Sequence, residues 1–148
     1  MEIKFVMQED PIWRELMQYA LDCSWSAGPW LAKDMAERRF KGWERVLVAM
    51  EGNAIAGYCT LAKTDCIPEV PYSPYIGYVF VGEPFRGNRL SEKMIDYLLD
   101  YANQLGFEKV YLVSDHEGLY EKYGFVVIDQ KPDSSGRMEQ IFVRSSHA

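Results

Sequence analysis

The sequence predicts a single mixed α/β (α+β) domain, residues 1–148, in which strands and helices alternate along the chain. Two observations predict it. Short runs typical of strands are interspersed with segments whose apolar residues recur at helical spacing. In addition, 48% of the 148 residues are apolar, and no repeat, low-complexity segment or internal linker divides the chain. A domain of this size can bury a substantial core.

In the first half of the chain, helix-starting and turn residues separate the expected elements. Asp10 and Pro11 form an N-cap and N1 pair for a helix, and Pro29 opens a second helix after the break at 23–28. Glu51-Gly52-Asn53 is a tight hairpin turn. The expected elements are a strand at 2–6, helices at 11–21 and 29–40, and strands at 45–50 and 54–63.

The second half begins with a loop, 64–74, because its three prolines are incompatible with a central strand. Its one long helix carries a continuous apolar stripe and stops at Gly106. The expected elements are strands at 75–81 and 109–113, the long helix at 90–105, a short helix at 117–123, and hairpin strands at 125–128 and 138–143 around a loop at 129–137.

Composition excludes several classes of function. A net charge of −6 argues against a nucleic-acid partner, which requires a basic face. Three cysteines and two histidines without metal-ligand spacing predict no metal site. The N-terminus lacks a secretory apolar segment, and no apolar run approaches membrane-spanning length. We therefore expect a reduced, soluble, cytoplasmic protein with no membrane partner.

The turn between the strand at 75–81 and the helix at 90–105 predicts an anion site. The first turn of a helix offers unpaired N–H groups and partial positive charge, and Arg86 and Arg89 add two full charges there. A phosphate-bearing ligand is the first expectation. The alternative is a solvated loop whose arginines pair with nearby acids such as Glu83 and Glu92.

A second motif, Leu119-Tyr120-Glu121-Lys122-Tyr123-Gly124-Phe125, follows some thirty residues later, with Gly124 as a left-handed cap before the next strand. With this motif the chain resembles the GNAT family of N-acetyltransferases. The resemblance is specific from Tyr75 to Phe125 and topological elsewhere. It implies the acyl-CoA N-acyltransferase fold, a central, mostly antiparallel mixed sheet of about seven strands flanked by about four helices.

The family's phosphate motif, Arg/Gln-x-x-Gly-x-Gly/Ala, can be placed on this sequence position by position. Arg86 fills its first position and Gly87 and Asn88 the variable ones, whereas Arg89 stands where the family has its first glycine. We expect Arg89 to adopt the ordinary negative φ of a first helical turn. The resemblance implies that acetyl-CoA contacts Phe80, Val81, Arg86, Gly87, Asn88, Arg89, Leu90, Ser91 and Tyr120.

The resemblance implies acetyl transfer from acetyl-CoA to an amine by direct attack in a ternary complex. A backbone N–H in the stretch from Val79 to Val81 would stabilise the charge that develops on the thioester oxygen. Tyr120 matches the tyrosine that acts as general acid toward the departing thiolate. The alternative is a tyrosine that only packs in the core, a role for which Tyr123 is the better candidate.

The general base is left open by the sequence, since no glutamate lies in the strand at 75–81. The candidates are Asp65 and Glu69 in the proline-rich loop at 64–74, and Asp115 or His116 just after the strand at 109–113. A histidine has an ordinary pKa suited to the task. A water chain, or a partly neutral amine, would need no dedicated base.

Two loops contain the candidate acceptor residues. Trp25 and Trp30 can form an aromatic wall for an ammonium group, or both can anchor their loop in the core. Asp65, Glu69 and Tyr75 can complete a pocket that prefers cations. The expected partner is a primary amine of a small molecule or peptide. A homodimer is a common assembly for folds of this kind.

Two functions from different classes remain. One is an N-acetyltransferase; the other is a non-catalytic acyl-CoA-binding or sensing module of the same fold. Arg89 in place of the motif glycine favours the second. Tyr120 favours the first, because a module that only binds has no need of a proton donor.

Overall fold

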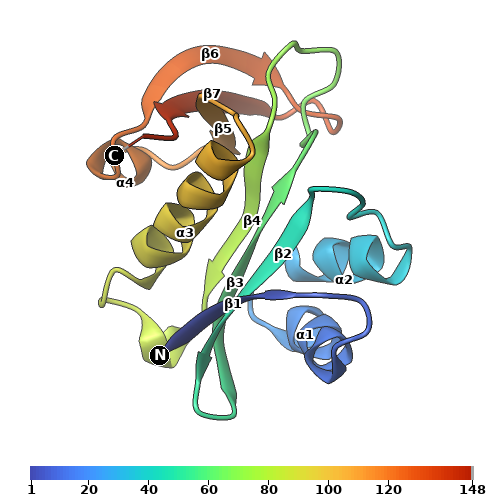
Figure 1. Cartoon of the computed structure of the whole chain (residues 1–148). Helices are drawn as coiled ribbons and strands as arrows, with labels where there is room; N and C mark the ends of the chain where they lie inside the picture. The colour runs from blue at the N-terminus through green and yellow to red at the C-terminus, as the bar shows by residue number, and fades with distance from the viewer. Residues whose placement is uncertain (148) are drawn as a thin grey trace. The chain divides into compact units, whose positions relative to one another are not determined.

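The computed structural model describes residues 1–147, which form a seven-stranded mixed sheet with the strand order β1-β2-β3-β4-β5-β7-β6 (Figure 1). Of the pairings with a described register, β4 and β5 are parallel, and β1–β2, β5–β7 and β6–β7 are antiparallel. The elements are β1 (Glu2–Val6), α1 (Pro11–Asp22), α2 (Gly28–Ala36), β2 (Arg45–Glu51), β3 (Ala54–Ala62), β4 (Tyr75–Val81), η1 (Glu83–Phe85), α3 (Leu90–Gln104), β5 (Lys109–Ser114), α4 (Leu119–Lys122), β6 (Val126–Pro132) and β7 (Met138–Ser145). The predicted element order and fold class are therefore confirmed.

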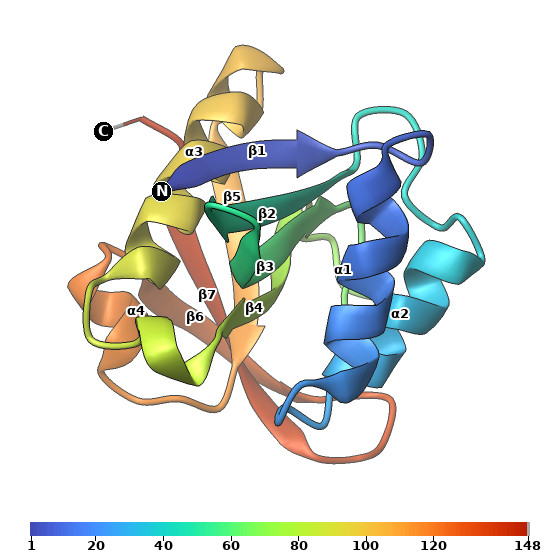
Figure 2. The ribbon, with the colours of Figure 1, turned by 90° about the horizontal axis from the view of Figure 1, so that it is seen from below.

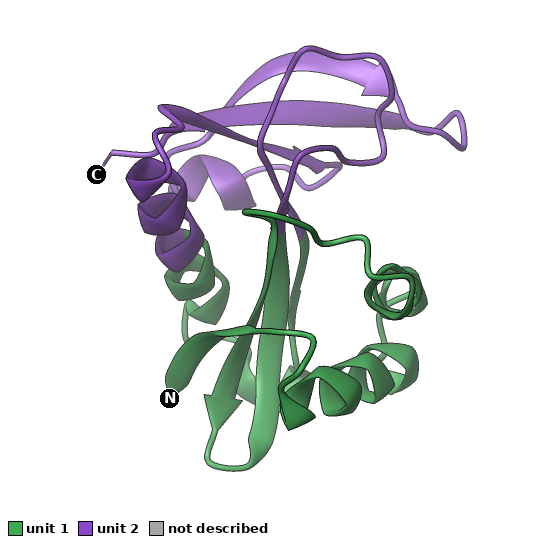
Figure 3. Ribbon diagram, turned by 45° about the vertical axis from the view of Figure 1, so that its right-hand side comes forward, with its two compact units in different colours: residues 1–60, 78–95 green, residues 61–77, 96–148 purple. Residues whose placement is uncertain are grey.

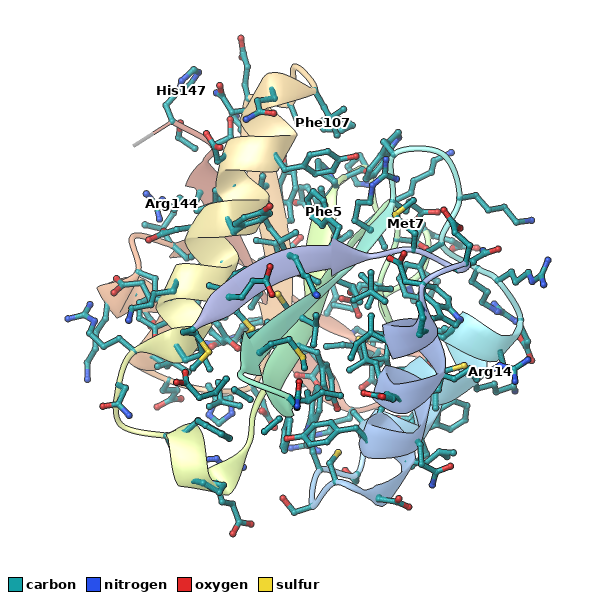
Figure 4. The ribbon with its side chains drawn as sticks, turned by 60° about the horizontal axis from the view of Figure 1, so that its bottom comes forward. Phe5, Met7, Arg14, Phe107, Arg144 and His147 are labelled. Atoms are coloured by element: carbon teal, nitrogen blue, oxygen red, sulfur yellow. The ribbon has the colours of Figure 1, made fainter. Side chains whose placement is uncertain are left out.

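The start of α1 shows how local chemistry sets an element boundary. Pro11 is its first residue and Asp10 its N-cap, as predicted. The Asp10 carboxylate, however, accepts a hydrogen bond from the backbone N–H of Met7 at 2.8 Å (Figure 4 labels Met7). The aspartate therefore closes the turn between β1 and α1.

Two predicted boundaries are wrong by several residues. The second helix ends at Ala36 rather than near Phe40, and Arg38 follows with a left-handed φ of 55°. The predicted loop at 129–137 is strand as far as Pro132, because its backbone pairs with β7 from Asp129↔Ile141 to Pro132↔Met138. A register shift between Val127 and Asp129 precedes that pairing. Residues 129–132 of this edge strand lack the alternation of apolar and polar residues by which strands are predicted from a sequence.

The chain divides into two compact units (Figure 3). Unit 1 consists of residues 1–60 and 78–95. Within it, β1 pairs with β2 from Glu2↔Met50 to Val6↔Val46, and α1 and α2 lie side by side (Figures 1 and 2). Their apolar faces pack with strand residues into one core, whose buried members include Leu16, Leu31, Met35, Val48, Tyr58 and Phe80.

Unit 2 consists of residues 61–77 and 96–148, of which the last is not described. Its strands β5, β7 and β6 pair in that order. Arg144 of β7 (labelled in Figure 4) donates from Nη1 to the carbonyl oxygen of Tyr123 at 2.8 Å and thereby ties the end of α4 to the sheet. The buried side chains of unit 2 include Tyr75, Ile76, Leu112, Tyr120, Phe125 and Phe142.

None of the helices in residues 1–147 is long and apolar enough to cross a membrane.

Candidate functional site

The predicted anion turn lies in unit 1 and is built by the end of β4. The N–H of Gly82 donates to the carbonyl oxygen of Ala56 at 2.8 Å, and the short 3-10 helix η1 follows. Arg86 then has extended dihedrals and Gly87 a left-handed φ of 88°. Residues 86–89 are exposed, and α3 begins directly after them at Leu90. The chain therefore presents an open turn at the N-terminus of a long helix.

Arg89 differs from the expectation. Its φ is +57°, so the predicted negative value is wrong. A side chain in this conformation costs about 1–2 kcal/mol, which a glycine would not incur. The Arg89 guanidinium binds Glu92 through two hydrogen bonds, Nε to Oε1 at 2.7 Å and Nη2 to Oε2 at 2.9 Å. Pairing with a nearby acid is the alternative to an anion site that the sequence allows, and Arg89 forms such a pair.

Arg86 is held differently. Its Nε donates to the carbonyl oxygen of Val81 at 2.9 Å, and its guanidinium carbon lies 5.6 Å from the centre of the Phe80 ring. The arginine is exposed, whereas Phe80 is buried. A cation thus projects from the end of β4 next to the N-terminus of α3, at the point where helix polarity favours an anion.

The contrast between the two arginines gives a test. Arg89→Gly is expected to raise the free energy of unfolding by about 0.5 kcal/mol, because relief of the left-handed strain exceeds the lost ion pair and the added freedom of the unfolded chain. Arg86→Gly is expected to lower it, since Arg86 has an ordinary φ of −74°. Urea denaturation of both variants measures the difference. A less stable Arg89→Gly protein would contradict the assigned strain.

One residue of β4 has an unexpected backbone conformation. Tyr78 has a left-handed φ of 50° within this strand, directly before the stretch from Val79 to Val81 in which the resemblance places a backbone N–H donor. Its hydroxyl donates to Asp34 Oδ2 at 2.7 Å, and that carboxylate also lies 3.6 Å from Nε of Arg39. Tyrosine is common in strands, so nothing in the sequence indicates a left-handed backbone at Tyr78. Left-handed residues inside strands are typical of bulges that re-aim the backbone.

The two candidate tryptophans are placed differently. Trp25 is half-buried and stacks on Phe80, with ring centres 5.9 Å apart and planes at 6°. It also contacts Tyr58 and Tyr78. Trp30 is 62% exposed on α2, and Nζ of Lys33 lies 5.5 Å from its ring centre. Trp25 therefore belongs to an aromatic cluster beside the anion turn, and Trp30 lies on the surface.

In unit 2, Tyr120 lies at the start of α4 and is only 6% exposed. Its ring contacts those of Tyr123, Phe125 and Phe142. The exposed ring of His116 is 6.5 Å away, centre to centre. Gly124 has a φ of 91°, as its predicted capping role requires, and the N–H of Phe125 donates to the carbonyl oxygen of Tyr120 at 3.1 Å. These contacts hold the Tyr120 ring in a buried aromatic cluster next to the end of α4.

The remaining acceptor candidates also lie in unit 2. Tyr75 is 1% exposed, and burial, assisted by Asp65, raises the pKa of its hydroxyl to about 12. Asp65 is half-exposed, and one of its oxygens accepts from the N–H of Cys66 at 2.6 Å. Glu69 is exposed with a φ of 58°. The structure thus brings Asp65 close to Tyr75 and leaves Glu69 on the surface of its loop.

Sequence reasoning missed Glu139 on β7. Burial raises the pKa of this half-buried carboxyl group, Asp115 raises it further, and Arg137 opposes them. Arg137 itself forms an ion pair with Asp115. The acid was missed because an isolated glutamate in an edge hairpin has no distinguishing pattern.

The comparisons with known proteins identify the family. The family model described as "Acetyltransferase (GNAT) family" matches residues 12–125. The chain belongs to this acetyltransferase family. The match includes the anion turn and the motif that contains Tyr120, and it ends before Glu139. No curated protein matched the sequence.

Solved structures share the acetyltransferase fold over nearly the whole chain. An aminoglycoside 6'-acetyltransferase type Ii has a TM-score of 0.76 at 17% identity, covering 100% of this chain and 99% of its own. The Salmonella typhimurium protein yncA with its cofactor acetyl-CoA has 0.66 at 19%, covering 100% and 95%. A spermidine N-acetyltransferase SpeG mutant from Vibrio cholerae has 0.69 at 15%, covering 98% and 93%.

The raised pKa of Glu139 predicts a pH effect on this acetyltransferase. The folded protein holds the Glu139 proton more tightly than the unfolded chain, so stability is lost as pH rises from about the ordinary value of 4.5 through the folded pKa. Glutamine does not titrate. Glu139→Gln is therefore expected to match the wild type near pH 4 and to be more stable at pH 7. Urea denaturation at both pH values measures the stability of the variant and of the wild type. Equal stability of the two proteins at pH 7 would contradict the prediction.

Proposed function

We propose that this chain is an N-acetyltransferase that moves the acetyl group of acetyl-CoA to a primary amine of a small molecule or peptide. The observation that carries the proposal is the exposed turn 86–89, which opens the 15-residue helix α3 in a chain of the GNAT family. Solved structures of the same fold include acetyltransferases named for aminoglycosides and spermidine, which are amines. This supports an amine acceptor here.

The turn fits the pyrophosphate of coenzyme A. A methyl group added at the Gly87 Cα would meet no atom of the described chain within 4 Å, so a ligand can approach the backbone. The N-terminal N–H groups of α3 have no carbonyl partner within the helix. Arg86 and the polarity of α3 supply positive charge, while Glu92 compensates that of Arg89. The anion would therefore bind chiefly to backbone N–H groups and Arg86, with Gly87, Asn88, Leu90 and Ser91 beside it.

Acetyl-CoA supplies the activated acetyl thioester; the chain supplies proton transfer and positioning. Tyr120 would hold a proton on its hydroxyl and give it to the thiolate as the general acid. The backbone near Phe80 and Val81, which follows the left-handed residue Tyr78, would donate an N–H to the thioester oxygen. His116, beside the Tyr120 ring, and Glu69 are the proposed acceptors of the amine proton.

The second candidate function, an acyl-CoA-binding module without catalysis, is favoured by the Arg89–Glu92 pair, which reduces the charge of the turn. A thermal-shift titration with acetyl-CoA, followed by a thiol-release screen of polyamines, amino acids, aminoglycosides and peptide N-termini, separates the two. An acetyltransferase should show both a higher Tm and thiol release. A higher Tm without release from any amine would favour the module, and no shift at millimolar coenzyme would contradict both.

A further inference from the structure

Tyr78 interrupts the extended backbone of β4. Its φ is +50°, in the left-handed region that residues with a side chain rarely adopt. Such a residue keeps this conformation only where its surroundings hold it, and it is typical of positions at which a strand changes direction. Tyr78 directly precedes the stretch from Val79 to Val81, whose backbone is the proposed N–H donor to the thioester oxygen. The contacts that hold Tyr78 therefore help to set where that donor lies.

The hydroxyl of Tyr78 is bound to helix α2. It donates to Oδ2 of Asp34 at 2.7 Å, in a part-buried hydrogen bond between residues 44 positions apart in the sequence. A hydrogen bond to a carboxylate is stronger than one between neutral groups. The other oxygen of Asp34 lies 3.6 Å from Nε of Arg39, and the backbone N–H of Arg39 donates to the Asp34 carbonyl oxygen at 3.0 Å. The carboxylate that accepts from Tyr78 is therefore held near the C-terminal end of α2.

The ring of Tyr78 is held as well. Its plane lies at 76° to that of Trp25, with ring centres 6.4 Å apart, an edge-to-face contact. Trp25 in turn stacks on Phe80. Tyr78 is half-buried and packs against the core of unit 1, to which α1 and α2 contribute buried side chains. A packed ring and a bound hydroxyl together oppose the return of Tyr78 to an extended backbone.

Strand β3 leaves room for the backbone that follows Tyr78. A methyl group added at the Gly57 Cα would lie 2.6 Å from the carbonyl oxygen of Phe80 and 3.4 Å from Cα of Val81. The Phe80 carbonyl therefore lies against Gly57 of β3. In a trans peptide this carbonyl and the N–H of Val81 point in opposite directions. The Val81 N–H therefore points away from β3 and does not pair with that strand.

We propose that Tyr78 and Asp34 are positioning residues for acetyl transfer: the hydrogen bond between them keeps Tyr78 left-handed and so holds the Val81 N–H in the direction that the thioester oxygen needs. This inference rests on the proposed acetyltransferase function and adds to it two side chains that act through the backbone. All of these residues lie in unit 1, green in Figure 3. Neither side chain has to touch the substrate. Their effect is on a backbone donor that matters more in the transition state than in the ground state.

Steady-state thiol release from acetyl-CoA tests the inference, with spermidine, kanamycin, lysine and a tripeptide as the amines. Tyr78→Phe keeps the ring beside Trp25 and removes the hydroxyl, and Asp34→Ala removes the carboxylate that accepts from it. Each variant is expected to lower kcat about 10- to 100-fold while KM for acetyl-CoA stays within about threefold, because a displaced donor weakens chiefly the transition state. The double variant should lose no more than the larger single loss, because both changes break the same hydrogen bond.

Two further variants separate positioning from stability. Asp34→Asn retains an amide oxygen that can accept from the Tyr78 hydroxyl, so its kcat should stay within about fivefold of the wild type. Tyr72→Phe is the matched control, since the Tyr72 hydroxyl also donates to an aspartate, Oδ2 of Asp129 at 3.3 Å, in unit 2. Its kcat should stay within about twofold of the wild type, because no backbone donor of the reaction is assigned to that bond.

Unchanged kcat in Tyr78→Phe, or an equal loss in Tyr72→Phe, would overturn the inference and leave the proposed function standing. A loss in Tyr78→Phe that disappears at a temperature where the variant is folded would also overturn it, because the hydrogen bond would then only stabilise the fold. A wild-type protein that binds acetyl-CoA but releases no thiol with any of the four amines would contradict the proposed function and, with it, this inference.

Discussion

Replacing Tyr120 with phenylalanine is expected to lower kcat at least about 100-fold while coenzyme affinity stays nearly unchanged. Loss of a general acid removes only transition-state stabilisation, which appears in kcat and not in ground-state binding. The ring can stay where it is, because its contacts with Tyr123, Phe125 and Phe142 do not need the hydroxyl. Steady-state thiol release gives kcat, and acetyl-CoA titration followed by fluorescence or calorimetry gives affinity.

Tyr123→Phe is the matched control for this experiment. Tyr123 is also buried, belongs to the same aromatic cluster and lies three residues further along. The same loss of one hydroxyl should therefore leave kcat within about threefold of the wild type, since no proton transfer is assigned to it. Unchanged turnover in Tyr120→Phe, or equal losses in the two variants, would show that the assigned acid is wrong.

Elements with strong local signals could be predicted from the sequence. The apolar stripe of α3 and its stop at Gly106, whose φ is 93°, are properties of neighbouring residues alone. The same is true of Gly124 after α4. Polar stretches that pair through their backbone are different: residues 129–132 become strand because β7 lies beside them. Nothing in their own side chains specifies that partner.

In the candidate site too, only the locally encoded residues could be predicted from the sequence. The anion turn and Tyr120 each belong to a short continuous motif, so their residues could be named from the sequence. The burial of Tyr75 and the partial burial of Glu139 depend on strands that are distant in sequence. The left-handed φ of Arg89 and of Tyr78 is not indicated by either residue type. At Arg89 and Tyr78 the backbone departs from the conformation that these residue types prefer, as is common at functional or strained positions.

Phe80 links the stability of unit 1 to the anion turn. It is 7% exposed, stacks on Trp25 and Tyr58 with ring centres 5.9 and 5.3 Å away, and supports the Arg86 guanidinium. Phe80→Ala is expected to lower the free energy of unfolding by about 3–5 kcal/mol, because truncation removes apolar burial and leaves a cavity. A Tm fall of about 10 °C or more follows from that loss in a chain of this size.

Phe80→Leu separates packing from the contact with Arg86. Leucine refills part of the volume, so we expect a smaller loss of stability, whereas the aromatic support of the guanidinium is lost in both variants. Both proteins should therefore bind acetyl-CoA more weakly at a temperature where they are folded. Trp30→Ala is the control for removing an exposed aromatic ring, and it should cost less than about 1 kcal/mol. If Phe80→Ala were no less stable than Trp30→Ala, Phe80 would not be a core residue, because burial is what distinguishes the two rings.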